Sequence, residues 1–265
     1  MPAPFSTPIP YPRPARLSDP GHDFTSEECA AILAVPDDRL GWPELGEIFQ
    51  SYLPAGDYAE CAYFIPRALR FIDERGGAAS DVADNFIAWA GEQKRELDAD
   101  GLFAPIRDHL VALLRECLSG FRIEFGPAKG KDAPFPVDSD LAETLIVSLN
   151  RSSPRTGEYP FGKAATPVFL DTVGRLRSLS DASWFALFAS WLERGIFHNG
   201  AVIDAPLFEC LADEDNAVRA RDILREDVRR DPSLAACWAK WFRGSSWTLD
   251  KPEEHQHPAT NLRGG

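Results

Sequence analysis

Apolar residues recur three and four positions apart along most of the chain, which is the spacing of one face of an α-helix. One such segment covers residues 61–72 and contains Pro66. Proline has no amide hydrogen and its ring obstructs the preceding turn, so this helix begins near Ile65 or is kinked at the proline. No segment shows a sustained strand alternation, except for a short run at residues 121–125.

Residues that begin and end helices bound these segments. Thr25 and Ser26 can cap a helix that Pro36 stops. Ser80 and Asp81 begin another, whose apolar face continues to residue 97. Short links between such segments favour antiparallel neighbours. The sequence therefore predicts an all-α protein, built as a multi-helix bundle or as stacked antiparallel helical hairpins, with at most a short strand near residues 121–125.

The chain divides into an arm, a helical body and a tail. Residues 1–20 are rich in proline and are predicted to be extended. Three arrangements of this N-terminal arm are open: docking on an aromatic groove, a loose terminus, or packing along its own body through Phe5, Ile9 and Tyr11. The last two together are favoured over docking on a groove. The body is predicted at residues 21–250, and residues 251–265 are predicted to be a flexible tail.

A turn-rich loop at residues 121–137 is the best boundary within the body, and it gives possible halves at residues 21–120 and 138–250. Residues 80–90 and 180–193 both begin with Ser-Asp and carry an aromatic face. The two halves are therefore related by duplication, or two amphipathic helices resemble each other by chance.

Charge narrows the range of partners. The chain has 28 basic and 41 acidic residues and a formal net charge of −13. This excess of negative charge disfavours binding to the phosphate backbone of nucleic acids and to anionic membrane surfaces. It suits a basic protein partner, whose encounter it would accelerate. A simpler interpretation is that the charge maintains solubility.

The cysteines and the N-terminus indicate the compartment. Five cysteines are widely spaced without a C-x-x-C pair, which is typical of small buried residues in a reducing environment. The N-terminus has no continuous apolar stretch of the kind found in a signal peptide, and no apolar run approaches the roughly 18 residues of a membrane helix. The cytoplasm is the expected location.

Catalytic and metal-binding motifs are missing from the sequence. There is no H-E-x-x-H, no G-x-S-x-G and no dinucleotide fingerprint. The segment GPAKGK at residues 126–131 lacks the first glycine and the Ser or Thr of a phosphate-binding loop. No cofactor, metal site or catalytic residue is predicted.

Two acidic surfaces are the candidate partner-binding sites. In the first, carboxylates recur every four residues, which places them on one face of the predicted helix. In the second, the stretch from residue 204 to 215 contains no basic residue. The candidate residues are Glu92, Glu96, Asp100, Glu209, Asp213, Glu214 and Asp215.

The chain ends in Leu262-Arg263-Gly264-Gly265. This terminus resembles that of ubiquitin-like modifiers, and the resemblance covers these four residues. It implies threading of the narrow terminal glycines into the channels of activating or deconjugating enzymes.

Three classes of function follow. The first is a protein-binding or neutralising module of the bacterial cytoplasm, such as an immunity-type protein that uses an acidic surface against a basic partner. An enzyme with a site assembled between the two halves is the alternative, and ubiquitin-like use of the Gly-Gly terminus is the second alternative.

Overall fold

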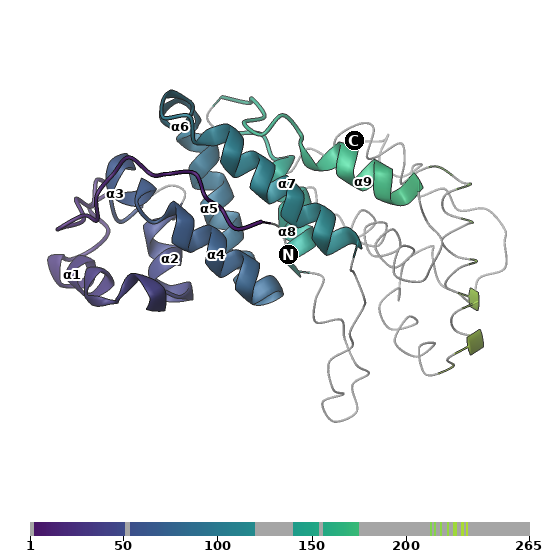
Figure 1. Cartoon of the computed structure of the whole chain (residues 1–265), viewed down its shortest axis with the longest axis horizontal. Coiled ribbons are helices and arrows are strands. Elements are labelled where there is room, and N and C mark those ends of the chain that lie inside the picture. Colours follow the sequence, from purple (N-terminus) through teal and green to yellow (C-terminus); the bar gives the residue numbers. More distant parts are fainter. Residues whose placement is uncertain are drawn as a thin grey trace, which may run out of the picture. The chain divides into compact units, whose positions relative to one another are not determined.

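The structure is a computed structural model that describes residues 3–50, 54–119, 140–153 and 156–174, with single positions between 213 and 232. In these residues it contains α-helices and short 3₁₀ helices and no strand (Figure 1). The predicted all-α fold class is therefore confirmed. The predicted strand at residues 121–125, the loop at residues 121–137 and the tail lie outside the described residues.

Most of the described helices lie in the N-terminal half of the chain. The helices are α1 (Ser26–Ala34), η1 (Asp37–Arg39), α2 (Trp42–Ile48), α3 (Tyr58–Ala62), α4 (Ile65–Arg75), η2 (Gly76–Ala79), α5 (Ser80–Glu92), α6 (Lys94–Ala99), α7 (Phe103–Ser119), α8 (Asp140–Leu149) and α9 (Ala165–Gly174).

Two compact units make up the chain. The first comprises residues 1–116 and 140–164, and the second comprises residues 117–139 and 165–265. Helix α8 therefore belongs to the first unit, although it follows the loop that the sequence suggests as a boundary. The candidate site described below lies entirely within this first unit.

The core of the first unit forms around α5, which contacts α2, α4 and α8. Trp89 of α5 is only 1% exposed, and its ring centroid lies 5.0 Å from that of Phe49. Phe86, one turn earlier, packs its edge against Phe49 at the same centroid distance. Aromatic pairs at such distances add roughly 0.5–1.5 kcal/mol each beyond the area that they bury.

Helix α1 begins and ends where its local sequence requires. Thr25 accepts a hydrogen bond from the Glu28 amide, and the Glu28 carboxylate accepts one from the Thr25 amide at 2.7 Å. This reciprocal capping box satisfies two amide groups that the first turn leaves without partners. The helix stops at Ala34, two residues before Pro36. The cap and the stop were both predicted from the sequence.

The proline at position 66 lies in the first turn of α4, so the helix begins at Ile65 rather than bending there. The first turn tolerates proline because its amide has no partner within the helix. A short separate helix, α3, precedes α4. Of the two alternatives that the sequence left open, the structure confirms the first.

The single helix predicted from Ser80 to residue 97 is wrong, because α5 ends at Glu92 and α6 begins at Lys94. The loop after α8 packs against this end of α5. A Cβ atom added to Gly91 would lie 3.2 Å from Pro160 Cγ, so the missing side chain lets this loop approach the end of α5.

Candidate protein-binding site

One part of the first unit carries most of the uncompensated negative charge. Between residues 23 and 60 the sequence contains nine acidic residues and a single basic one, Arg39. We call this stretch, which spans α1, η1, α2 and the start of α3, the acidic segment. Its acidic residues are Asp23, Glu27, Glu28, Asp37, Asp38, Glu44, Glu47, Asp57 and Glu60.

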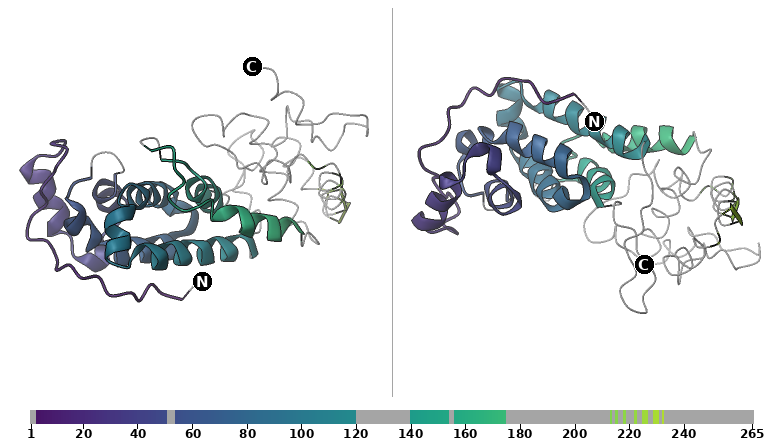
Figure 2. Two further views of the ribbon diagram at one scale, coloured as in Figure 1. Left: turned by 90° about the horizontal axis from the view of Figure 1, so that it is seen from above. Right: turned by 60° about the horizontal axis from the view of Figure 1, so that its bottom comes forward.

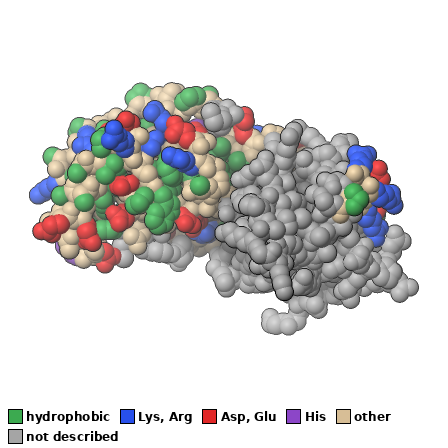
Figure 3. Space-filling view, turned by 90° about the horizontal axis from the view of Figure 1, so that it is seen from below, with side chains coloured by type: hydrophobic (Ala, Val, Ile, Leu, Met, Phe, Trp, Pro, Cys, Tyr) green, Lys and Arg blue, Asp and Glu red, His purple; other side chains and the backbone are tan. Residues whose placement is uncertain are grey.

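Figure 3 shows red carboxylates at the end of the first unit formed by α1 and its neighbours. Several of them cap helices: Glu44 accepts a bond from the Gly41 amide, and Asp57 accepts one from the Glu60 amide. Glu27 and Asp38 are exposed. Among the described residues, Asp37 is the one member of the segment with a cationic partner. The segment therefore presents a negative potential to solvent.

The negative charges of the acidic segment affect the pKa of Glu47. Burial raises the pKa of this half-buried carboxyl, and the charges of Glu28 and Glu44 raise it further. Like charges raise the pKa of a carboxyl because they disfavour its ionised form. The glutamates of α1 and α2 thus repel one another in the free protein.

Trp42 is an exposed tryptophan within the acidic segment. It begins α2, and 53% of its surface is exposed. Val218 is the other large apolar side chain found exposed among the described residues. Tryptophan is enriched at the centres of protein interfaces and offers the best face for a cation. Sequence reasoning missed both Trp42 and the acidic segment, although a running charge count would have located the latter.

The N-terminal arm lies along the outside of the first unit, as Figure 2 shows for residues 3–16. Phe5 meets His109 of α7 edge-on, with ring centroids 6.1 Å apart. The Tyr11 hydroxyl donates a 2.6 Å hydrogen bond to Asp100 Oδ2. These contacts confirm the interpretation in which the arm packs along its own body.

Asp100 holds the arm through Tyr11 and also bonds to Tyr58 of α3. The hydroxyls of Tyr11 and Tyr58 both donate to its Oδ2, at 2.6 Å and 2.7 Å. The bond from Tyr11 and then the bond from Tyr58 lower the pKa of the Asp100 carboxyl. The bond to Asp100 is also the main cause that raises the pKa of Tyr11. Both shifts show that the arrangement is built around an ionised carboxylate.

We expect acid to release the arm near Tyr11. Because the pKa of Asp100 is lowered in the folded protein, the stabilisation that it gives to the packed arm is complete above the unperturbed pKa of about 3.9. This stabilisation is lost as the pH falls through the lowered pKa. Because the pKa of Tyr11 is raised, its hydroxyl stabilises the packed arm up to about pH 10, and this stabilisation is lost as the pH rises through the raised pKa. The amide order parameters of Ile9 and Tyr11, measured by NMR from pH 7 to pH 2.5, will fall in acid.

Asp100→Asn is the matched control for this titration, because it keeps an acceptor oxygen and removes the ionisable proton. Its arm will show no step in acid. An arm that is already mobile in the wild-type chain at pH 7 would contradict the role assigned to Asp100.

The carboxylates predicted at residues 92–100 do not share one helical face, because the break after α5 separates them. Glu96 is exposed on α6, whereas Asp100 is engaged by the two tyrosines. Of the second predicted patch, Asp213 and Asp215 are described and exposed. Glu209 and Glu214 lie outside the described residues, as do Leu262, Arg263, Gly264 and Gly265.

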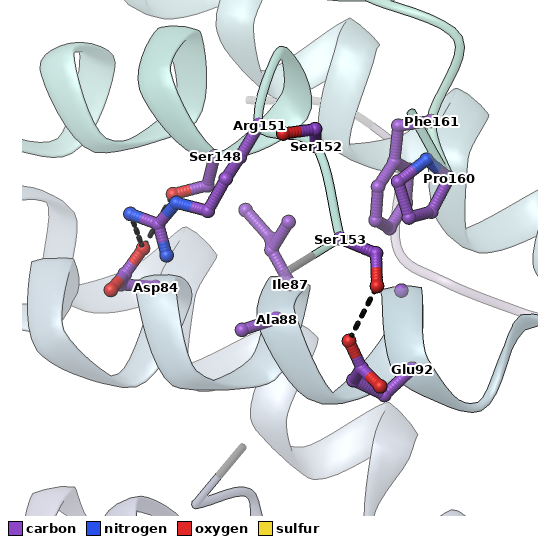
Figure 4. A pocket seen from close by; sticks show the side chains of 11 residues that line it. Asp84, Ile87, Ala88, Glu92, Ser148, Arg151, Ser152, Ser153, Pro160 and Phe161 are labelled. Atoms are coloured by element: carbon purple, nitrogen blue, oxygen red, sulfur yellow. Dashed lines mark hydrogen bonds and ion pairs between the residues drawn. The ribbon is translucent and has the colours of Figure 1, made fainter. Parts of the chain in front are cut away.

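Glu92 lines a cavity of about 170 Å³ between α5 and the loop after α8. At one side Arg151 pairs with Asp84 Oδ1 at 2.9 Å, and Ser148 donates to the same oxygen at 2.6 Å (Figure 4). At the other side Ser153 donates to Glu92 at 3.0 Å, with apolar side chains in between. The polar groups of this cavity thus bond to one another within the first unit.

His109 is buried in α7 and lines neither this cavity nor the one described below. Its Nε2 lies 3.1 Å from Asp73 Oδ1, and the ring of Phe5 covers its edge. His109 therefore links α7 to α4, through Asp73, and to the arm, through Phe5.

Comparison with known proteins returned no relative: no family model matches the chain, no curated protein is significantly similar to it, and no solved structure matches it. None of the described helices is long and apolar enough to cross a membrane. In the same part of the chain, no three His, Cys, Asp or Glu side chains converge where a metal ion would fit.

Proposed function

We propose that the protein is a binding module of the bacterial cytoplasm that captures and neutralises a basic protein, as an immunity-type protein does. The observation that carries this proposal is the exposed Trp42 within the acidic segment. Uncompensated carboxylates attract a cationic surface over distances up to the Debye length, about 8 Å at physiological salt. The indole then provides the apolar anchor that a stable interface needs at its centre.

The carboxylates of the acidic segment and the indole of Trp42 contribute separately to the binding of the partner. Carboxylates such as Glu27 and Asp38 accelerate encounter with a basic surface and lose this effect at high salt. Trp42 slows dissociation, because its ring leaves water on binding and stacks against an arginine or lysine. The partner is therefore expected to present a cationic residue beside an apolar patch.

Replacing Trp42 with Ala will weaken partner capture by roughly 30-fold or more, the effect of losing a hot spot worth about 2 kcal/mol. The immobilised full-length chain is exposed to lysate of its native host, and the captured protein is identified by mass spectrometry and its dissociation constant measured. Glu27→Gln combined with Asp38→Asn will slow association and reduce its salt dependence.

Asp81→Asn is the control variant, since Asp81 is exposed on α5 outside the acidic segment. Glu96→Gln separately tests the surface predicted at residues 92–100. If capture survives Trp42→Ala and is lost in Glu96→Gln, the docking face lies on α6. If the captured protein is not basic, or nothing is captured, the proposed function is rejected.

A further inference from the structure

The guanidinium of Arg13 fills a site with well-defined acceptors. Its Nε donates to Asp37 Oδ1 at 2.9 Å, and one terminal nitrogen donates to the carbonyls of Leu33 at 2.9 Å and Val35 at 3.2 Å. Leu33 lies in the last turn of α1, and Val35 is its C-cap. Arg13 thus bonds to carbonyls that the helix end leaves without amide donors.

The end of α1 needs a cation that the helix itself does not supply. Its last turn contains no basic residue, although its first turn carries Glu27 and Glu28. The C-terminus of a helix carries a partial negative charge, and the Asp37 carboxylate adds a full one. A planar guanidinium, with donors in a fixed fork, fits these acceptors better than a lysine ammonium does.

Tyr63 holds Asp37 in place for this contact. Its hydroxyl donates a short hydrogen bond to Asp37 Oδ2, the oxygen that does not receive Arg13 Nε. This bond is the main cause that raises the pKa of Tyr63. The carboxylate is therefore anchored to the body of the molecule and does not depend on the arm for its position.

The arm itself is held loosely enough to be exchanged. The side chains of Arg13 and Asp37 are 41% and 38% exposed, so solvent reaches both groups and screens their attraction. A cavity of about 490 Å³ separates the arm from α4 and η1. Its walls include Ile9 and Tyr11 of the arm and Asp37 and Tyr63 of the body, so the arm spans a gap here.

From these observations we propose that the C-terminal end of α1 and Asp37 form an arginine subsite, which Arg13 occupies in the free protein and an arginine of the basic partner enters on binding. The inference rests on the proposed function, since it assigns the partner's residue. Asp37 and Asp38 belong to the acidic segment, so the subsite continues the proposed docking face. The N-terminal arm is then a built-in competitor, present at high effective concentration.

The prolines around Arg13 indicate the shape of the ligand. Residues 10–14 read Pro-Tyr-Pro-Arg-Pro, which favours an extended polyproline conformation. A partner segment that presents an arginine in an extended, proline-flanked stretch would reproduce the contacts of the arm. The arm sequence itself is therefore the appropriate probe.

The test uses a fluorescent peptide with the sequence of residues 8–16, PIPYPRPAR, added to the full-length chain. Wild type will bind it weakly, because its own arm occupies the subsite. Arg13→Ala will bind it at least tenfold more tightly, and the double variant Tyr11→Phe, Arg13→Ala, which also loses the bond from Tyr11 to Asp100, will bind it at least as tightly as Arg13→Ala does. Adding Asp37→Asn will abolish the gain, whereas Arg16→Ala, which changes an exposed neighbour, will leave wild-type binding unchanged.

A second peptide with Gln in place of the arginine at position 13 tests the chemistry of the subsite, and it will bind the Arg13→Ala chain at least tenfold more weakly. The subsite is rejected if this peptide binds equally well, or if wild type and both arm variants bind the arginine peptide alike. If the subsite is rejected while Trp42→Ala still weakens the capture of a basic partner, the proposed function stands. If the peptide results hold but no basic partner is captured, the subsite stands without that function.

Discussion

Replacing Trp89 with Ala will lower the free energy of unfolding by about 3–5 kcal/mol, the usual cost of removing a large aromatic ring from a packed core. The indole is 1% exposed, so the cavity left behind stays closed to solvent. Its centroid lies 5.0 Å from that of Phe49 and 6.2 Å from that of Phe86, and it stacks on Tyr58. One substitution therefore removes a contact between α5 and each of two other parts of the chain.

Urea unfolding monitored by far-ultraviolet circular dichroism measures this loss. Trp42→Ala is the matched control, because the same side chain is removed from a position that is 53% exposed. Its effect on stability will stay within about 0.5 kcal/mol. Equal destabilisation by the two variants would show that Trp89 does not anchor the core around α5.

Cys61 will react with a thiol reagent at least about a hundredfold more slowly in the native protein than in urea. Its side chain is fully buried, and its sulfur lies 3.2 Å from the Ile48 carbonyl and 3.3 Å from the Gly56 carbonyl. Burial raises the pKa of the thiol, which suppresses the reactive thiolate. Reaction therefore requires opening of the α2–α3 region, which costs several kcal/mol in a folded domain.

Mass spectrometry of peptides after timed labelling resolves Cys61 from the other cysteines. Cys117, which is only partly buried, serves as the internal reference and will label faster. Native labelling of Cys61 at the rate of Cys117 would show that the segment between α2 and α3 opens readily.

Local sequence signals predicted the helix ends that local contacts determine. The box formed by Thr25 and Glu28 lies within a single turn, so its residues are recognisable without the fold. The start of α4 at Ile65 was one of two alternatives that the sequence left open, and it agrees with the rule that admits proline to a first turn. Such signals depend on atoms that are neighbours in the sequence.

The packing at the end of α5 was not predictable, because Pro160, which lies against Gly91, is 69 positions away along the chain. The same holds for Asp100: its spacing from Glu96 suggests a solvent-facing acidic surface, but Tyr11 and Tyr58 bond to it. Trp42 carries no local signal of its exposure, because exposure depends on how the rest of the folded chain packs around the side chain. The charge of the acidic segment, by contrast, could have been found by counting charges over residues 23–60 alone.

The approach of Pro160 to Gly91 leaves no room for a methyl group without displacement of the loop. Among homologous chains, a side chain at position 91 is therefore expected to appear together with a smaller or shifted residue at position 160. The two positions would then vary as a pair, and this covariation would record their contact in sequences whose structures have not been determined.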